Sequence, residues 1–250
     1  GHLKVVEMLL AVDGIQVNKA GNEEATPLYI ASQNGHLKVV QMLLAVDGID
    51  VNQADNDEAT PLYIASQNGH LKVVKMLLAV DGIQVNQADN EECTPLFVAC
   101  AKGHSKVVKM LLVVDGIQVN QANNNGTTPL WMACQECHSK VIEMLLAVDG
   151  IQINQANDEE ATPLSIACQE GHLKVVKMLL AVGCILVNQT NNKQATPLSM
   201  ACKNGHSKVV KMLLAVAGIE VNQADANGWT SLNAACWNGH LKVVESLLAV

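Results

Sequence analysis

The stretch that decides the fold is ATPLYIASQNGHLKVVKMLLAVDGIQVNQAD, which runs from residue 59 to residue 89. Close copies of it recur every 34 residues along the 250-residue chain. All six prolines fall in one column of the repeat, each within a Thr-Pro-Leu triplet, and the seventh copy reads Thr230-Ser231-Leu232. The eight histidines form a second column: His2, His36, His70, His104, His138, His172, His206 and His240. A fixed period of this length predicts a solenoid, in which each module buries its apolar face against its neighbours.

The composition favours thin layers of aliphatic helices, because 49% of the residues are hydrophobic but only 2% are aromatic. The net charge is -8, and every one of the 16 basic residues is lysine. Arginine makes the bidentate contacts to phosphate and guanine, so its absence argues against a nucleic-acid partner. No apolar run reaches the roughly 18 residues that span a bilayer, and no signal peptide is evident, so we expect no membrane partner.

Eight cysteines without a pairing plan predict a reducing compartment, and we expect an intracellular, cytoplasmic protein. The chain opens at Gly1-His2, in the middle of a module, and stops at Val250, where an apolar helix ends. Solenoids normally close with polar-faced capping modules, so we interpret the chain as a piece of a longer array. Apolar faces left open at both ends then predict end-to-end self-association.

The sequence of each module predicts two helices followed by a finger, a loop that joins one module to the next. Thr26-Pro27 starts the first helix, because threonine is a good N-cap and proline at the first helical position loses no hydrogen bond. Gly35 ends it, and His36 begins a second helix with apolar residues at helical spacing. That helix ends near Asp47-Gly48, a turn signal. Residues 49–59 then carry a polar tip that suits a hairpin-like finger joining one module to the next.

Five short motifs of the central stretch recur together: Thr60-Pro61-Leu62-x-x-Ala65, Gly69-His70, Val73-Val74, Leu77-Leu78 and Val85-Asn86. Together they resemble the ankyrin repeat, whereas the Trp, Tyr and Phe pattern of the equally long tetratricopeptide repeat is missing. The resemblance covers the whole chain in seven copies. It implies an all-α ankyrin-repeat solenoid of stacked helix-turn-helix modules joined by hairpin-like fingers. We expect one array over residues 1–250, with a half module at 1–25 and modules starting near 26, 60, 94, 128, 162, 196 and 230.

Two departures from the family pattern stand out. Ankyrin modules usually have 33 residues, and here Val80-Asp81-Gly82-Ile83 carries one residue more. The histidine that the family has after Thr-Pro-Leu is replaced in every module, by Tyr29, Tyr63, Phe97, Trp131, Ser165, Ser199 and Asn233. The sequence leaves open whether the four aromatic members of this column pack in the core or form a binding surface.

The strongest signal for a cofactor is Cys134-Gln135-Glu136-Cys137-His138, which has the C-x-x-C-H spacing of covalent haem attachment. Two columns produce it by coincidence, because His138 belongs to the histidine column and Cys134 to a small-residue packing column. That second column contains Ser32, Ser66, Cys100, Cys134, Cys168, Cys202 and Cys236. Equivalent positions in stacked layers lie roughly 10 Å apart, too far for a shared zinc ion or a disulfide. We therefore expect no cofactor and no metal.

The histidine column and a column of asparagines after each second helix are interpreted as structural. The asparagines are Asn18, Asn52, Asn86, Asn120, Asn154, Asn188 and Asn222, and their amides are placed to bond adjacent fingers. No Ser/His/Asp set, glycine-rich phosphate loop or isolated carboxylate pair interrupts the repetition. We therefore predict that the chain is not an enzyme.

Function in such an array lies in the positions that vary between modules. Several finger tips are acidic: Glu23-Glu24, Asp57-Glu58, Glu91-Glu92 and Glu159-Glu160. Lys193 interrupts them, and with Lys203 it joins the candidate partner-binding set. Trp229 and Trp237 complete that set, because both match positions that ankyrin proteins commonly vary to contact partners. A solvated charged edge explains the acidic tips equally simply.

Lysines also begin each second helix, where a cation opposes the helix dipole at a cost of about 0.3–1 kcal/mol. Copying of one ancestral lysine explains this column as well as selection does. Its members are Lys4, Lys38, Lys72, Lys106, Lys140, Lys174, Lys208 and Lys242, joined one turn on by Lys75, Lys109, Lys177 and Lys211. The column would give the array one basic and one acidic side.

These patterns predict a non-catalytic scaffold for protein–protein interaction, with a partner bound along the finger tips and the first-helix face. Acidic tips would favour a basic segment of the partner. Two alternatives stay open. Near-identical modules also suit a mechanical or spacer array, and the chain could be the targeting arm of a larger protein with its active domain elsewhere.

Overall fold

The computed structural model describes residues 2–21 and 23–250, and this part of the chain contains fifteen α-helices and no strand. Gly1 and Asn22, both in the expected half module, lie outside the described residues. The first helices of the modules are α2 (Pro27–Gln33), α4 (Pro61–Gln67), α6 (Pro95–Ala101), α8 (Pro129–Gln135), α10 (Pro163–Gln169), α12 (Pro197–Lys203) and α14 (Ser231–Trp237). The second helices are α1 (Leu3–Leu10), α3 (Leu37–Leu44), α5 (Leu71–Leu77), α7 (Ser105–Leu111), α9 (Ser139–Leu146), α11 (Leu173–Leu180), α13 (Ser207–Leu214) and α15 (Leu241–Leu248).

The first helices begin and end as their sequence predicts. Thr60 is the N-cap of α4, and its Oγ1 accepts a hydrogen bond from the Tyr63 N–H at 3.1 Å. Proline follows at the first helical position, where its missing N–H costs nothing. At the other end Gly69 adopts a φ of 72°, and the N–H of His70 donates to the Ala65 carbonyl at 2.9 Å. This is a Schellman ending, which satisfies carbonyls that the helix itself leaves open.

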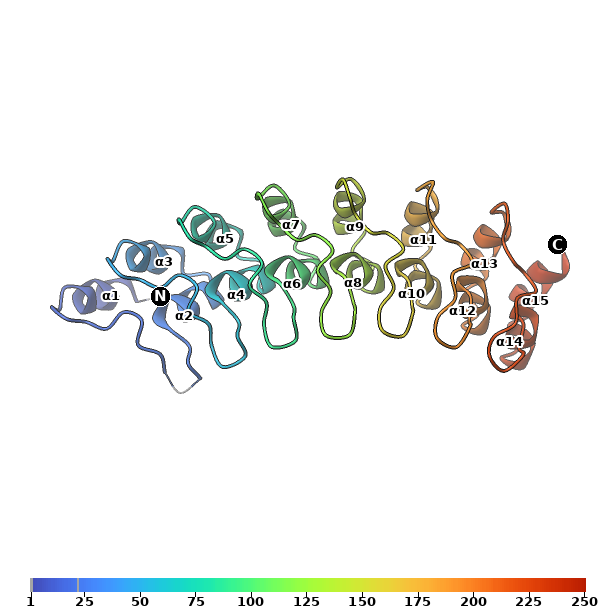
Figure 1. The fold of residues 1–250 in the computed structure, drawn as a ribbon, viewed down its shortest axis with the longest axis horizontal. Coiled ribbons are helices and arrows are strands. Elements are labelled where there is room, and N and C mark those ends of the chain that lie inside the picture. The colour runs from blue at the N-terminus through green and yellow to red at the C-terminus, as the bar shows by residue number, and fades with distance from the viewer. Residues whose placement is uncertain (1, 22) are drawn as a thin grey trace. The chain divides into compact units, whose positions relative to one another are not determined.

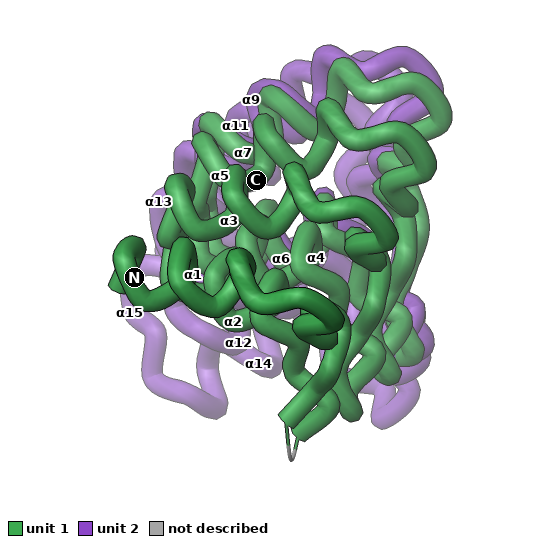
Figure 2. Tube along the Cα trace, turned by 90° about the vertical axis from the view of Figure 1, so that its left-hand side faces the viewer, with its two compact units in different colours: residues 1–124 green, residues 125–250 purple. Residues whose placement is uncertain are grey.

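The chain divides into two compact units, residues 1–124 and residues 125–250 (Figure 2). In the first unit α2, α4 and α6 pack side by side, and α3, α5 and α7 each pack on the first helix of the same module. The second unit repeats this arrangement with α8, α10, α12 and α14 in one row and α9, α11, α13 and α15 in the other. In both units the finger loops extend beyond the row of first helices (Figure 1).

The core lies between these helix layers and is aliphatic. In the second module Leu62, Val74 and Leu77 are fully buried, and the equivalent leucines of the modules that start near 94, 128, 162 and 196 behave alike. The small-residue column is buried as expected at Cys100, Cys134, Cys168 and Cys202. Cys236 is the exception and is exposed: its helix, α14, packs against α12 and α15, and no first helix follows it in the described chain. The expected packing role of this column therefore holds wherever a following module covers it.

The histidines join each module to the previous one. Nε2 of His70 lies 2.9 Å from the Gln33 carbonyl, and His104 makes the same bond to Gln67. His172, His206 and His240 repeat the contact in the second unit at 2.8–3.0 Å. The ring also lies over the preceding glycine turn, so that a Cβ added to Gly35 would be 2.6 Å from Nδ1 of His70. The structural interpretation of this column is confirmed.

The asparagine column forms a second ladder. Nδ2 of Asn52 donates to the Gly82 carbonyl at 2.9 Å, and its Oδ1 accepts from the Gln84 N–H at the same distance. Asn18 bonds Gly48 and Asp50 in the same way. The bonded segment is therefore the turn after the next second helix and the start of its finger.

Candidate interaction surface

Five of the described fingers are tight turns closed by an acidic or amide side chain. In the finger that ends the second module, Oδ1 of Asp89 accepts from the N–H of Glu91 at 3.0 Å and of Cys93 at 2.8 Å. The Asp89 N–H donates to the Cys93 carbonyl at 3.1 Å, which pairs the two arms of the finger. Glu92 adopts a φ of 59°, a left-handed conformation that leaves its side chain exposed at the tip. Asp55, Asn157, Asn191 and Asp225 make the same turn in other fingers.

Neighbouring finger tips are joined by backbone hydrogen bonds. In the first unit the N–H of Asn56 donates to the Glu23 carbonyl, and that of Asn90 to the Asp57 carbonyl, at 3.2 and 2.9 Å. This places the acidic pairs side by side and exposed: Glu23-Glu24, Asp57-Glu58 and Glu91-Glu92. In the second unit Glu159-Glu160 is followed by the tip with Lys193, and the Ala226 N–H donates to the Lys193 carbonyl at 2.9 Å. The two units thus present differently charged fingers.

Trp229 and Trp237 lie together in the second unit. Trp229 immediately precedes Thr230, the N-cap of α14, and Trp237 is the last residue of that helix. Their ring centroids are 5.5 Å apart, and the rings meet edge to face at 75°. Trp229 is 38% exposed and Trp237 is 77% exposed. Aromatic rings at this spacing stabilise each other, but the pair still leaves a large apolar surface in water.

Two lysines lie about one repeat before the tryptophans along the chain. Lys193 is at the neighbouring finger tip, and Lys203 ends α12, the helix that packs against α14. The Nε2 atom of His240 lies 3.0 Å from the Lys203 carbonyl, which fixes the end of α12 against the start of α15. Both side chains are exposed, and within the described chain neither ammonium makes an ion pair.

Comparison with known proteins identifies the modules. The profile described as Ankyrin repeats (3 copies) matches residues 1–55, 48–123, 82–157, 113–191, 147–225 and 183–250, which together cover the chain. The chain belongs to the ankyrin repeat family. Its fold is the all-α ankyrin solenoid that the sequence predicts. Ankyrin repeat domains generally serve as protein–protein interaction modules, and they are typically non-catalytic.

Two solved structures resemble this ankyrin array. The human ASB11 ankyrin repeat domain superposes with a TM-score of 0.76 at 29% identity, covering 90% of this chain and 97% of the other. The ankyrin repeat domain of Bcl-3, described as a unique member of the IkappaB protein family, gives 0.78 at 24% identity, covering 92% and 100%. No curated protein matches the sequence.

The aromatic column of this ankyrin chain belongs to the core. Tyr29, Tyr63, Phe97 and Trp131 are all buried. The Tyr63 hydroxyl donates to Oδ2 of Asp89 at 2.6 Å, and Nε1 of Trp131 donates to the Ala161 carbonyl at 2.8 Å. Burial and the Asp89 carboxylate both raise the pKa of Tyr63. Each polar ring therefore bonds the next finger along the chain, and the side chain is not available to a partner.

The two cysteines of the C-x-x-C-H sequence lie in different surroundings. Cys134 is fully buried in its packing column, whereas Cys137 is exposed in the turn that follows α8. The two thiols therefore share no accessible surface. Burial also raises the pKa of the Cys134 thiol, which keeps it protonated and weakly nucleophilic. No group of three or more histidine, cysteine or acidic side chains is placed to hold a metal within the described residues.

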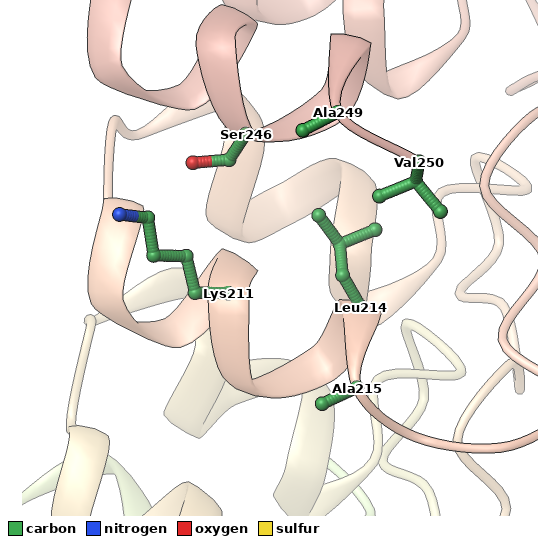
Figure 3. Close-up of a pocket in the computed structure, with 6 residues that line it drawn as sticks. All are labelled: Lys211, Leu214, Ala215, Ser246, Ala249 and Val250. Atoms are coloured by element: carbon green, nitrogen blue, oxygen red, sulfur yellow. The ribbon is translucent and has the colours of Figure 1, made fainter.

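A pocket of about 310 Å³ lies between α13 and α15 (Figure 3). Its lining residues are Lys211, Leu214, Ala215, Ser246, Ala249 and Val250. Ser246 stands where the other seven second helices have methionine, so a shorter side chain opens the space. Its hydroxyl donates to the Lys242 carbonyl at 2.7 Å. The walls are mostly apolar, and their polar side-chain groups are the Lys211 ammonium and the Ser246 hydroxyl. Separately, none of the described helices combines the length and the apolar character needed to cross a bilayer.

Proposed function

We propose that this ankyrin chain is a non-catalytic scaffold that binds a protein along its finger tips and first-helix ends, with Trp229 and Trp237 as the anchor. The observation that carries the proposal is the exposure of Trp237, which is 77% accessible although it is the largest apolar side chain type. Tryptophan is enriched among interface residues whose loss costs about 2 kcal/mol or more. A chain with three tryptophans that leaves two of them together at the surface favours recognition there.

The acidic finger tips support a second contact, made in the first unit. Glu23, Asp57 and Glu91 and their neighbours are exposed and lie on bonded fingers, so they present a row of carboxylates. We propose that this row attracts a basic part of the partner. Charges at the rim of an interface mainly raise the association rate, and added salt weakens the effect.

The remaining features of the partner follow from composition. A chain without arginine suits a protein partner better than a nucleic acid. The lysine-rich second helices α5 and α7 do not carry the exposed apolar face that docking on a membrane needs. Eight free cysteines, with four of them in one buried column, favour a reducing, intracellular compartment.

We also propose that copies associate end to end. No residue of α1 is buried, and Met8 is 73% exposed. At the other end Leu248 of α15 is 70% exposed. Covering such surface gains about 25 cal/mol for each Å² of apolar area removed from water, so contact between the two faces is favourable.

The anchor is tested on a partner captured from an extract. Trp229→Ala and Trp237→Ala should each lower the affinity of the purified partner, by about tenfold or more for an anchor residue. Lys72→Glu is the control, because Lys72 is exposed on α5, a second helix away from the fingers.

A spacer role would give a different result. The regular histidine and asparagine bonds between modules suit an array that sets distance, and the two rings could simply cover the surface of α14. In that case both tryptophan variants would bind the partner normally but unfold at lower temperature. That outcome would remove the proposed site.

A further inference from the structure

We infer that the segment bound at the tryptophan pair is acidic: an apolar side chain packs on Trp229 and Trp237, and flanking carboxylates reach Lys193 and Lys203. The inference rests on the proposed function and names the partner chemistry of that site. The inference also assigns the two units different binding preferences. The carboxylate row of the first unit attracts basic groups, whereas this part of the second unit attracts acidic ones.

The first supporting observation is that the site offers hydrogen-bond donors. Indole and ammonium groups donate and do not accept. Nε1 of the buried Trp131 already donates to Ala161, but within the described chain the indole N–H of neither Trp229 nor Trp237 has an acceptor. A ligand that satisfies them must supply oxygen acceptors, and carboxylates are the strongest ones in a polypeptide.

The second observation is the placement of the two lysines. The Ala226 N–H bonds the Lys193 carbonyl at 2.9 Å, which joins the finger of Lys193 to the finger that carries Trp229. Lys203 and Trp237 occupy the same column and end adjacent first helices, α12 and α14. Each lysine therefore belongs to a finger or helix that contacts the one carrying a tryptophan.

The third observation is that, among the described residues, no acidic side chain forms an ion pair with Lys193 or Lys203. Oδ1 of Asp225 accepts the N–H groups of Asn227 and Trp229, both at 2.9 Å, so this carboxylate is used within its own finger. Oε1 of Glu170 accepts from Nε2 of Gln169 at 3.1 Å, one repeat before Lys203. Glu159 and Glu160 lie one finger before Lys193.

The residues at Lys193, Lys203 and Trp237 differ from those at the same positions in other modules, which supports a function specific to this part of the chain. Trp237 and Lys203 stand where four other modules have glutamine: Gln33, Gln67, Gln135 and Gln169. Lys193 stands where the fingers of the first unit are acidic. A ring that only covered α14 would be indifferent to these charges, so the two explanations predict different effects of reversing them.

The test uses a displayed library of random twelve-residue peptides, selected against the whole chain at low salt. We expect selected peptides to combine an apolar residue with Asp or Glu within a few positions. Trp237→Gln should abolish their binding, and because glutamine occupies this column in other modules, the variant keeps the fold. The double variant Lys193→Glu/Lys203→Glu should weaken them by about tenfold or more, because it replaces attraction with repulsion.

A matched control separates local from overall charge. Lys208→Glu/Lys242→Glu changes the net charge equally, but on the exposed first turns of α13 and α15. Its effect on binding should stay below about twofold, as for charges remote from an interface. Two results would contradict the inference of an acidic partner segment but not the proposed scaffold function. The selected peptides could need Trp237 but be neutral or basic, or their binding could respond equally to both double variants. Selection of peptides that bind Trp237→Gln as well as the unaltered chain would overturn both.

Discussion

At the scale of single residues, the buried thiols and phenols should lower the stability of the folded chain at alkaline pH. Burial raises the pKa of Cys100, Cys134 and Cys168 above the ordinary value of 9.0, and burial with Asp89 raises the pKa of Cys93 to about 12. Above pH 9 the unfolded chain loses these protons while the folded chain keeps them. Because the folded state then binds more protons, its stability falls as the pH rises.

We therefore expect the free energy of unfolding to be constant up to about pH 8 and to decline above pH 9, with each such thiol contributing up to about 1.4 kcal/mol per pH unit. Urea unfolding at pH 7.5, 9.5 and 10.5 measures the decline. Cys100→Ser provides the control, since serine occupies this column at Ser32 and Ser66, and it should make the decline less steep. An unchanged stability up to pH 10.5 would show that these thiols do not titrate differently in the folded state.

At the scale of elements, the turn between the two helices of a module is held by the next histidine. Gly69 has a φ of 72°, and an added Cβ would be 2.6 Å from Nδ1 of His104. Gly82 has a similar φ of 80°, but an added Cβ would meet nothing within 4 Å. The two glycines therefore have the same backbone conformation, but only Gly69 is approached closely by a histidine ring.

We expect Gly82→Ala to lower the free energy of unfolding by about 1 kcal/mol, the cost of a left-handed alanine. Gly69→Ala should lower the free energy of unfolding by about 1–3 kcal/mol more, because the ring of His104 must move. Urea denaturation of both variants provides the comparison. Equal losses would mean that the histidine contact does not restrict this turn. Cys137 occupies the same column at a φ of 59°, so Cys137→Gly should stabilise the chain.

The sequence predicts these elements well where the signal is local. Thr60 and Pro61 mark the start of α4 and Gly69 its end, because capping depends on residues within one turn. The burial of Tyr63 could not be predicted in this way, since its hydroxyl bonds Asp89, 26 residues further on in the next finger. Cys236 follows its column in sequence but lacks the covering helix, so its exposure is also a property of packing.

The candidate site was only partly visible in the sequence. The rarity of aromatic residues pointed to Trp229 and Trp237, but their edge-to-face contact comes from the fold. Trp237 is the more exposed of the two rings, so it is the better test of binding.

At the scale of the whole molecule, the apolar end helices predict self-association. Light scattering should give an average mass that rises with protein concentration. Met8→Glu and Leu248→Glu should each reduce the rise, because either change places a charge on an apolar end face. Val113→Glu is the matched control, since Val113 is 78% exposed but follows α7 and belongs to neither end helix. A constant monomer mass at every concentration would contradict end-to-end association.

The central claim is that a partner covers the exposed ring of Trp237, and tryptophan fluorescence tests it most directly. Trp131→Phe removes the buried signal, because phenylalanine fills this column at Phe97, and leaves Trp229 and Trp237 as the fluorophores. On saturation with the captured partner we expect the emission to shift to shorter wavelength and quenching by acrylamide to fall, since the indole ring leaves water. Saturating binding with unchanged emission and unchanged quenching would show that the partner binds elsewhere.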